Sequence, residues 1–210
     1  MKRGFGPFFF SAMGDLNQRI FLEKLVPRAG GPVLEIGAKD YGSTTSFRDL
    51  YRDEEYVGVD LEAGKGVDVV ADLTAGLGGL QEGGFALAIC CSVLEHTPQP
   101  WALAANITRL LRADGQLYLS VPWVWRYHAY PDDYFRFSPR GVQVLFPGIE
   151  WGPATYSTTV NGEHIDLDLA DFREVDNRLA QYAQTPNGQR KYLPYLMVNM
   201  LGRKAGSAAP

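Results

Sequence analysis

Residues 126–139, RYHAYPDDYFRFSP, collect side chains that can transfer protons, bind metals or pair with anions. The run follows neither a period of 2 nor one of 3.6, so it predicts a loop rather than a strand or a helix. Its histidine, His128, belongs to the residue type that titrates near neutrality, and it is therefore a candidate general base. The alternative is a histidine that only forms hydrogen bonds within the loop.

A metal site is the second chemistry to weigh in this run. His128, Asp132 and Asp133 offer one nitrogen and two carboxylates. No further nitrogen or sulfur ligand stands nearby, and His164 lies far along the chain beside Glu163. Because zinc and related metals favour several nitrogen or sulfur ligands, we expect no metal here.

Glycines and acidic residues end three consecutive apolar runs. Gly37 follows the first run and lets a ligand approach the backbone, although Ala38 stands where a G-x-G-x-x-G dinucleotide motif has its second glycine. Asp60 ends the second run, and Ala71 to Leu73 follow the third. Converging strand ends predict a nucleoside site in the crevice of an α/β sheet. The alternative is a plain strand-to-helix turn whose glycines serve packing.

The apolar runs alternate with helical patterns. Expected strands cover residues 32–37, 55–60, 67–70, 85–91 and 116–122, and expected helices cover residues 15–26, 44–51 and 100–112. Most of the strands are apolar on both faces, as in a sheet that is covered on both sides. The alternation predicts an α/β fold with a doubly wound, mostly parallel sheet and helices on both faces.

Two of these helices carry specific expectations. The helix after Gly42 would begin near residues 43–45 and present unpaired N–H groups to an anionic part of a ligand. The helix over residues 15–26 has one apolar face, which is expected to pack on the core. That face consists of Leu16, Ile20, Phe21 and Leu25.

The rest of the chain shows no internal repeat and no low-complexity linker, so one domain over residues 1–210 is expected. It would carry an N-terminal helical cap at residues 1–28 and a loop insertion at residues 122–140. The remaining expected elements are a helix at 139–146, a strand at 155–160, a helical spacing over 165–182 and a closing strand at 192–204.

The composition narrows the partners and the compartment. The formal net charge is -4 and the basic residues are scattered, which argues against nucleic acid as a partner. Cys90 and Cys91 are neighbours and cannot bridge each other without strain, which suits the cytoplasm. No apolar run approaches about 18 residues and no signal-peptide cleavage pattern follows the N-terminus, so we expect neither a membrane span nor a signal peptide.

Three stretches together resemble the class I S-adenosylmethionine-dependent methyltransferases: VLEIGAKDYG, YVGVDLEAGKGVDVVADL and FALAICCSVLEHTPQPWALAANITRLLRADGQLYLSVP. The match runs from about residue 32 to 122, with a weaker match to 203. Residues 113–115, Ala-Asp-Gly, replace the Pro-Gly-Gly turn of the family. The resemblance implies a Rossmann-like fold with an antiparallel last strand. It also implies S-adenosyl-L-methionine as cofactor and S-adenosyl-L-homocysteine as product.

The resemblance also implies which residues hold the cofactor. Gly37 and its neighbours would lie against the methionine part, Asp60 would accept hydrogen bonds from the ribose hydroxyls, and Asp72 would meet the adenine together with the N–H of Leu73. Residues 91 and 92 would line the floor beside the sulfonium. The expected set is Glu35, Gly37, Ala38, Tyr41, Gly42, Asp60, Leu61, Asp72, Leu73, Cys91 and Ser92. Within it, the acidic residue of the first strand would hold the loop rather than take part in chemistry.

The spacing His-x-x-Pro-x-Asp-Tyr-x-Arg from His128 to Arg136 is similar to a segment found in a subset of these methyltransferases, often encoded with glycan or secondary-metabolite enzymes. In that subset Asp133 and Arg136 would pair and fix the loop, Tyr134 would pack over the cofactor pocket, and His128 would face the acceptor. A surface ion pair of little energetic value is the alternative for Asp133 and Arg136. His96, the remaining catalytic candidate, would form a wall of the site or act as the base.

The expected reaction is transfer of a methyl group from S-adenosylmethionine to a hydroxyl, or as second choice an amine, of a small molecule or saccharide. The aromatic residues around the loop suit a planar or sugar acceptor. An NAD(P)-dependent oxidoreductase is one alternative, but the chain has no Tyr-x-x-x-Lys pair. A non-catalytic nucleoside-binding scaffold is the other. The oligomeric state is left open, with a homodimer as one option.

Overall fold

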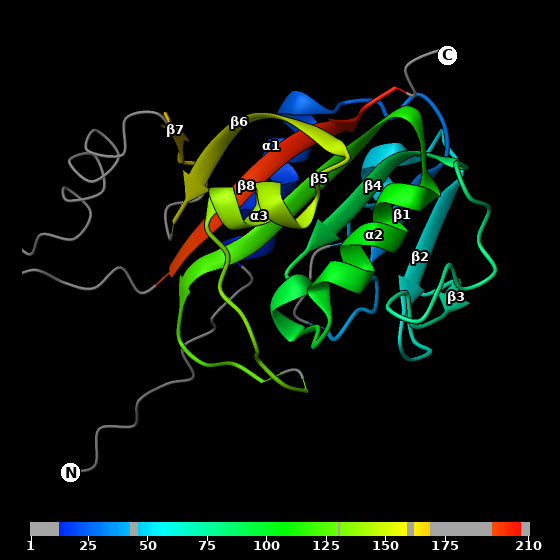
Figure 1. Cartoon of the computed structure of the whole chain (residues 1–210), viewed down its shortest axis with the longest axis horizontal. Helices are drawn as coiled ribbons and strands as arrows, with labels where there is room; N and C mark the ends of the chain where they lie inside the picture. The colour runs from blue at the N-terminus through cyan, green and yellow to red at the C-terminus, as the bar shows by residue number, and fades with distance from the viewer. Residues whose placement is uncertain (1–12, 43–45, 130, 159–161, 169–194, 207–210) are drawn as a thin grey trace, which may run out of the picture.

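The computed structural model describes residues 13–42, 46–129, 131–158, 162–168 and 195–206. Within these ranges the chain forms one sheet with the strand order β3-β2-β1-β4-β5-β8-β6-β7 (Figure 1). The strands are β1 (Val33–Ile36), β2 (Tyr56–Asp60), β3 (Val69–Val70), β4 (Phe85–Cys91), β5 (Leu111–Trp125), β6 (Ile149–Ser157), β7 (His164–Leu167) and β8 (Tyr195–Lys204).

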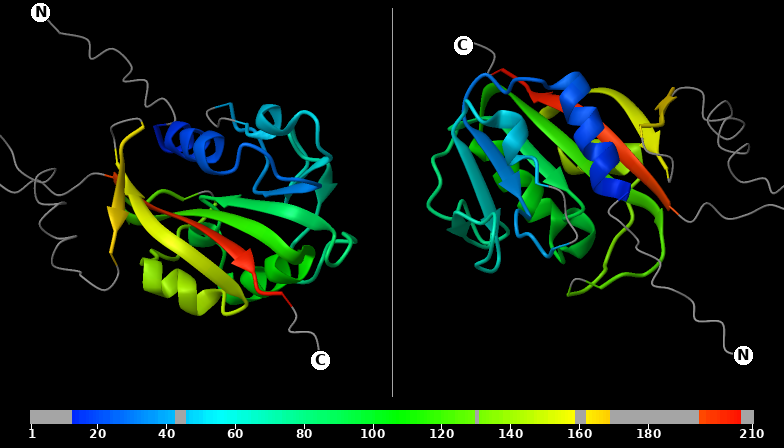
Figure 2. Two further views of the ribbon diagram at one scale, coloured as in Figure 1. Left: turned by 90° about the horizontal axis from the view of Figure 1, so that it is seen from above. Right: turned by 180° about the vertical axis from the view of Figure 1, so that it is seen from behind.

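Helices cover both faces of this sheet (Figure 2). The views place α1 and η1 on one face and α2 and α3 on the other. The elements are α1 (Met13–Leu25), α2 (Pro100–Leu110), α3 (Pro139–Leu145) and the 3-10 turns η1 (Arg48–Tyr51) and η2 (Leu94–His96). The fold class predicted from the alternation of apolar runs is confirmed. Among the described residues, no helix has the length and hydropathy needed to cross a bilayer.

Parallel pairing brings the ends of several strands to one edge. β1 pairs in parallel with β2 and β4, and Ile36 lies opposite both Val59 and Cys90. β2 pairs in parallel with β3, and β4 with β5. Because the strand order reverses between β1 and β4, the crevice at this switch point opens beyond the carboxyl ends of the strands. β8 is antiparallel to both β5 and β6, as the resemblance implied.

The central strands are buried on both faces. In β4 the side chains of Ala88 and Cys90 pack into the core shared with α2, whereas Leu87 and Ile89 pack into the core beneath α1. Successive strand residues point to opposite faces, so a strand between two helical layers is apolar throughout. This explains the unbroken apolar run of β4.

Several expected boundaries were wrong. The helix expected over residues 44–51 is only the short turn η1 in its described part, and the expected strand at 116–122 is extended to Leu111 and Trp125. The strand expected at 155–160 begins already at Ile149. Residues 159–161 and 43–45 lie outside the described residues.

The helical spacing expected from residue 165 was also wrong at its start. Residues His164–Leu167 form β7, which pairs antiparallel with β6. Ile165 and Leu167 are buried while Asp166 between them is exposed, which is the alternation of a strand. Residues 169–182 lie outside the described part of the chain.

The buried face of α1 differs from the expected one. Phe21 and Leu22 are buried, but Leu25 is 46% exposed. The sheet beneath α1 offers polar partners: Gln18 donates to the Ser120 hydroxyl at 3.1 Å, and the buried Asn17 side chain donates to a backbone carbonyl near the end of β6. Apolar spacing alone therefore located the helix but not its full contact face.

A buried polar network centred on Asn199 joins the middle of the sheet. Its Oδ1 accepts from the hydroxyls of Tyr118 at 3.1 Å and Ser120 at 3.0 Å. Its Nδ2 donates to the hydroxyl oxygen of Ser157 at 2.9 Å. All four side chains are fully or almost fully buried, so water does not replace these bonds when one is lost.

Replacement of Asn199 by alanine should lower the free energy of unfolding by about 2–4 kcal/mol, because it leaves buried hydroxyls without their partner. Urea denaturation measures this loss. Asn106→Ala is the control, since that half-buried amide donates one hydrogen bond to a backbone carbonyl and accepts one long, exposed bond from Arg109, a loss of about 1 kcal/mol. Equal losses in the two variants would contradict the role of the network.

Candidate functional site

The turn after β1 requires a glycine. Gly37 has φ +76°, and its N–H and that of Ala38 both donate to the carbonyl of Val59, at 2.9 and 3.1 Å. A Cβ at Gly37 would lie 2.5 Å from a methyl group of Val93, which follows β4. The left-handed conformation and this close approach both exclude a side chain at this position. The turn is therefore pressed against the segment that leaves β4.

Asp60, at the end of β2, holds two loops together. Its Oδ2 accepts the N–H of Lys39 and its Oδ1 accepts the N–H of Glu62, each at 3.2 Å. The Lys39 and Glu62 side chains form an ion pair across the same gap. A carboxylate has about four lone-pair sites, so two stay open for hydroxyl donors. The position fits a group with adjacent hydroxyls, such as a ribose.

The end of β3 continues this edge. Asp72 is exposed, and its Oδ1 accepts the N–H and the hydroxyl of Thr74 at 2.8 and 2.6 Å. Leu73 is buried, and its carbonyl accepts a hydrogen bond from the Asn106 side chain on α2 at 2.8 Å. The turn is thus fixed on the sheet with the Asp72 carboxylate at the surface.

The end of β4 forms a strained turn. Ser92 has φ +53°, which is uncommon for a residue with a side chain, and its N–H donates to the carbonyl of Ser120 at 2.9 Å. Cys91, the last residue of β4, is half-buried. These two residues lie at the same edge as Gly37 and Asp60 because their strands are parallel.

Four other expected cofactor residues lie around this edge. Glu35 accepts a hydrogen bond from the Tyr56 hydroxyl at 2.7 Å, and thereby contacts β2. Tyr41 and Leu61 are exposed on the two loops. The N–H of Gly42 donates to the Asp40 side chain at 2.7 Å. The helix start expected at residues 43–45 lies outside the described residues.

A buried ion pair fixes the loop that follows β5. The Asp133 side chain is 1% exposed and accepts from both terminal nitrogens of the Arg136 guanidinium, one of them at 2.7 Å. The backbone N–H of His128 donates to the same carboxylate at 2.8 Å. Arg136 also donates to the carbonyls of Trp125 and Arg126, at 3.3 and 3.2 Å. The guanidinium holds the pKa of Asp133 well below its usual range. The pair therefore closes the loop and is not a surface ion pair.

The loop docks on η2. The N–H groups of Tyr134 and Phe135 donate to the carbonyl of Glu95, at 2.7 and 3.3 Å. Nδ1 of His96 lies 2.6 Å from the carbonyl oxygen of Asp132. The Tyr134 hydroxyl donates to the Asp132 carboxylate at 3.0 Å, and its ring is exposed. Residues far apart in the sequence are thus brought to one place.

Docking sets the two histidines beside each other in defined tautomers. Their ring centroids are 4.9 Å apart. In His96, Nδ1 faces a carbonyl oxygen, so it must carry the proton. In His128, Nδ1 lies 3.2 Å from Oδ2 of Asp133 and 3.3 Å from the carbonyl of Arg126, and it also must carry the proton. Burial, with a contribution from His96, lowers the pKa of His128. Each ring keeps its Nε2 lone pair for another partner.

Glu95 is the functional candidate that sequence reasoning missed. It is 1% exposed, and in the described part of the chain neither carboxylate oxygen has a hydrogen-bond partner. Burial raises the pKa of Glu95 to about 8. One ligand atom each from Glu95, His96 and His128 lie within 4.8 Å of one another. The available signal was an acidic residue between Leu94 and His96, directly after a buried strand.

Comparison with known proteins relates this part of the chain to one family. Residues 34–119, which include most of β1, all of β2 to β4 and most of β5, match the family described as a methyltransferase domain. The chain is thus similar to methyltransferases over these residues, and the similar solved structures described below share the fold of S-adenosylmethionine-dependent methyltransferases. The resemblance read from the sequence is therefore confirmed. No curated protein matches the chain.

Solved structures similar to the methyltransferase share its fold at low identity. A SAM-dependent methyltransferase from Archaeoglobus fulgidus has 16% identity and a TM-score of 0.59, with 89% of this chain and 93% of that chain covered. The 1,6-didemethyltoxoflavin-N1-methyltransferase of Burkholderia thailandensis has 18% identity and a TM-score of 0.58, with 93% and 80% covered. Phosphoethanolamine N-methyltransferase 2 of Haemonchus contortus has 11% identity and a TM-score of 0.54, with 90% and 52% covered.

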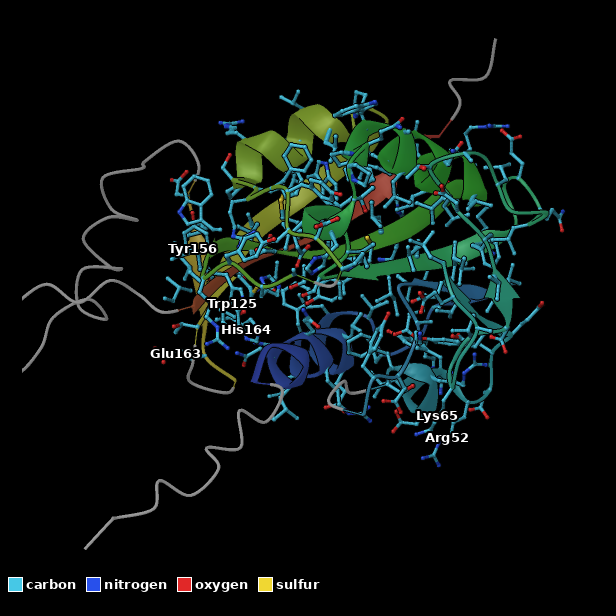
Figure 3. All side chains as sticks on the ribbon, turned by 90° about the horizontal axis from the view of Figure 1, so that it is seen from below. Arg52, Lys65, Trp125, Tyr156, Glu163 and His164 are labelled. Carbon is cyan, nitrogen blue, oxygen red and sulfur yellow. The ribbon has the colours of Figure 1, made fainter. Side chains whose placement is uncertain are left out.

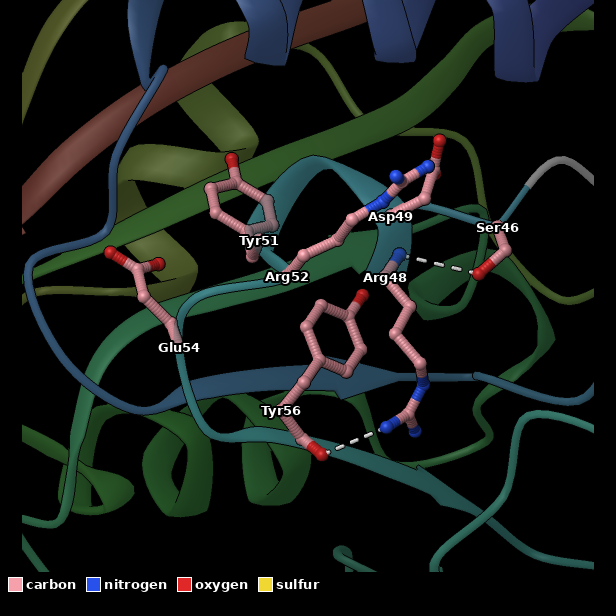
Figure 4. A pocket seen from close by; sticks show the side chains of 7 residues that line it. All are labelled: Ser46, Arg48, Asp49, Tyr51, Arg52, Glu54 and Tyr56. Carbon is pink, nitrogen blue, oxygen red and sulfur yellow. Dashed lines mark hydrogen bonds between the residues drawn. The ribbon is translucent and has the colours of Figure 1, made fainter.

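A surface hollow of the methyltransferase, of about 580 Å³, lies beside η1 and not at the strand ends (Figure 4). Two of its charged groups already have partners: Arg48 pairs with Asp68, and Glu54 accepts the N–H groups of Ala29 and Gly30. The described residues that line it include none of those expected to hold the cofactor. They are Ser46, Arg48, Asp49, Tyr51, Arg52, Glu54 and Tyr56.

Figure 3 separates this hollow from the histidines. Trp125, whose ring centroid lies 5.8 Å from that of His128, is at one end of the molecule. Arg52, on the rim of the hollow, is at the other end. The hollow therefore lies apart from His128 and its neighbours.

Burial of Glu95 should make the stability of the methyltransferase depend on pH. A folded-state pKa near 8, against an ordinary value of 4.5, means that the folded protein holds this proton more tightly than the unfolded chain does. The contribution of this proton to the free energy of unfolding is complete below pH 4.5, the ordinary pKa of a glutamate, and it is lost as the pH rises toward 8. In buffer with a chelator, the urea midpoint of the wild type should fall over this window more steeply than that of Glu95→Gln.

Glu82→Gln is the control for this measurement. Glu82 is exposed, and its hydrogen bond with Arg109 lowers its pKa, so it should not add to the slope above its ordinary value. Equal slopes for the wild type and Glu95→Gln would contradict the raised pKa.

Proposed function

We propose that this methyltransferase transfers the methyl group of S-adenosylmethionine to a hydroxyl group of a small molecule or saccharide, with an amine as second choice. His128 takes the hydroxyl proton in this proposal. The observation that carries this proposal is the pair of histidines, His96 and His128, which lie side by side just beyond the end of β4. In each ring the Nδ1 proton faces an oxygen atom of the loop, so the Nε2 lone pair remains for another partner. The activated methyl group needs only an aligned acceptor and a route for the proton.

The cofactor would lie along the edge formed by the ends of β1 to β4. In this arrangement Gly37 and Ala38 contact the methionine part, Asp60 accepts from the ribose hydroxyls, and Ser92 lies beside the sulfonium with Cys91. Asp72 and Leu73 contact the adenine. The open lone pairs of Asp60 and the exposed backbone of Gly37 support this placement.

A hydroxyl acceptor suits this site better than an amine. An alcohol holds its proton at neutral pH and needs a base during transfer, whereas an amine needs only its lone pair. His128 has a lowered pKa and is therefore neutral, with its Nε2 able to accept a proton. Because two of the similar solved structures named above are N-methyltransferases, an amine acceptor is the second choice.

A saccharide or a planar molecule suits the surroundings of the histidines. Trp123, Tyr127 and Tyr134 are exposed aromatic residues on or beside this loop. Aromatic rings offer flat apolar faces with a polar edge, which match sugars and planar ligands. We further propose that the protein acts in the cytoplasm, since its two cysteines, Cys90 and Cys91, are not joined in a disulfide, and that nucleic acid is not its substrate. Its oligomeric state stays open.

Thermal-shift titration tests the cofactor assignment. S-adenosylmethionine and S-adenosylhomocysteine should each raise the melting temperature, with a gain that grows as RT ln(1 + [L]/Kd), and NAD(P) should not. Asp60→Asn should weaken the effect of both ligands, because a ribose hydroxyl loses a charged acceptor. Selective stabilisation by NAD(P) would overturn the assignment. A shift by S-adenosylmethionine without turnover on any hydroxyl or amine panel would favour a scaffold role.

The role of His128 is tested by its asparagine variant. Asparagine can keep the hydrogen bond from the Nδ1 position to the carbonyl of Arg126 while it removes the Nε2 lone pair. Turnover should fall by about 10²-fold, with the affinity for S-adenosylhomocysteine unchanged. Asp132→Asn is the matched control in the same loop and should keep its activity. Near-normal turnover of His128→Asn would remove His128 from the proton transfer.

A further inference from the structure

We propose that Glu95, His96 and His128 bind a divalent transition-metal cation, with coordination positions left open toward the acceptor. This site goes beyond the methyl transfer proposed above, and its metal affinity can be measured without cofactor or acceptor. One ligand atom from each of the three residues lie within 4.8 Å of one another.

The three side chains offer lone pairs to the same small space. Both oxygens of Glu95 are buried and lack a hydrogen-bond partner among the described residues. The Nδ1 atoms of His96 and His128 donate to other groups, so each ring offers only an acceptor at Nε2. A buried carboxylate without a donor is costly, and a cation would satisfy it together with the two partly exposed imidazoles.

The hydrogen bonds behind the histidines are those of metal ligands. A ligating histidine commonly donates its other ring N–H to a carboxylate or a carbonyl, which fixes the ring and its tautomer. His96 does so with the carbonyl of Asp132, and His128 with the carbonyl of Arg126, while the Asp133 carboxylate lies 3.2 Å from the same Nδ1. Arg136 in turn fixes Asp133.

The distances are close to those of a metal site. Nε2 of His96 lies 3.9 Å from Oε1 of Glu95. Ligand atoms bound to one tetrahedral metal at 2.0–2.1 Å are about 3.4 Å apart, so small side-chain rotations suffice to close the site. The carboxylates of Asp132 and Asp133, which were weighed as ligands when we expected no metal from the sequence, serve Tyr134 and Arg136 instead. The carboxylate of the proposed site is that of Glu95.

The nitrogen and oxygen ligands of the proposed site determine which cation it binds and what that cation can do. Two imidazoles and one carboxylate favour zinc, iron(II) or cobalt(II) over magnesium or calcium, and they leave positions open. A hydroxyl bound there would have a lowered pKa. Its oxygen would form the bond to the methyl carbon as the sulfur–carbon bond breaks, and its proton would go to water. With the cation bound, His128 is a ligand and the cation replaces it as the activating group.

Cobalt(II) titration of the full chain, after chelator treatment and dialysis, tests the site. Visible d–d absorption should rise and saturate at one cation per chain, and zinc should displace it. His128→Asn and Glu95→Gln should each weaken cobalt binding by about 10²-fold or more. Asp132→Asn, whose side chain is not in the ligand set, should bind like the wild type.

The outcomes separate this proposal from the methyl-transfer proposal. Absence of a saturable cobalt band in a protein that S-adenosylhomocysteine still stabilises would overturn the metal site and leave the cofactor assignment intact. Unchanged cobalt affinity in His128→Asn, a variant on the surface loop, would also overturn it, whether or not Glu95→Gln folds. Saturable binding lost in both variants would support the metal site even if S-adenosylmethionine gave no stabilisation.

Discussion

The buried carboxylate of Asp133 is the interaction on which the acceptor side depends. An unpaired charge in this position is costly, and removing one partner of a buried pair costs about 3–5 kcal/mol. Arg136 and the N–H of His128 satisfy it, and the same guanidinium holds the backbone of residues 125 and 126. These bonds hold the loop after β5 in one conformation, although its sequence has neither a helical nor a strand period. The rigidity is what gives His128 a fixed tautomer and position.

The segment after β4 couples the two sides of the site. Its first residues, Cys91 and Ser92, end at the edge where the cofactor is proposed to lie. Val93 packs against Gly37, and the carbonyl of Glu95 receives the N–H groups of the loop after β5. A change in the position of this segment would therefore move both the cofactor edge and the histidines. The geometry links the proposed cofactor edge to the histidines through a few consecutive residues.

The sequence predicted the parts of the structure that follow from local pattern and parallel topology. Strands buried on both faces are apolar throughout, so β1, β2 and β4 were located within one residue at each end. Gly37 and Asp60 could be placed together because parallel strands end at one edge. The buried face of α1 could not be predicted, because Asn17 and Gln18 bond to groups that only the folded sheet brings beneath them.

The role of Glu95 could not be read from the sequence for a related reason. Its burial depends on a loop more than thirty residues later in the chain, whose Tyr134 and Phe135 amides bond to its carbonyl. Similarly, the alternation of buried and exposed residues in β7 was overlooked, because its apolar residues also fit a helical spacing that continues in the sequence after them. Long-range pairing decides such cases, whereas local periodicity does not.

The central claim is that the nucleoside cofactor binds along the ends of β1 to β4. A titration of the ¹⁵N-labelled protein with S-adenosylhomocysteine, followed by backbone amide NMR, tests it most directly. The largest chemical-shift changes should fall on Gly37, Ala38, Leu61, Leu73 and Ser92, with little change around η1. Largest changes around the hollow beside η1, or no saturable change at any amide, would contradict the account.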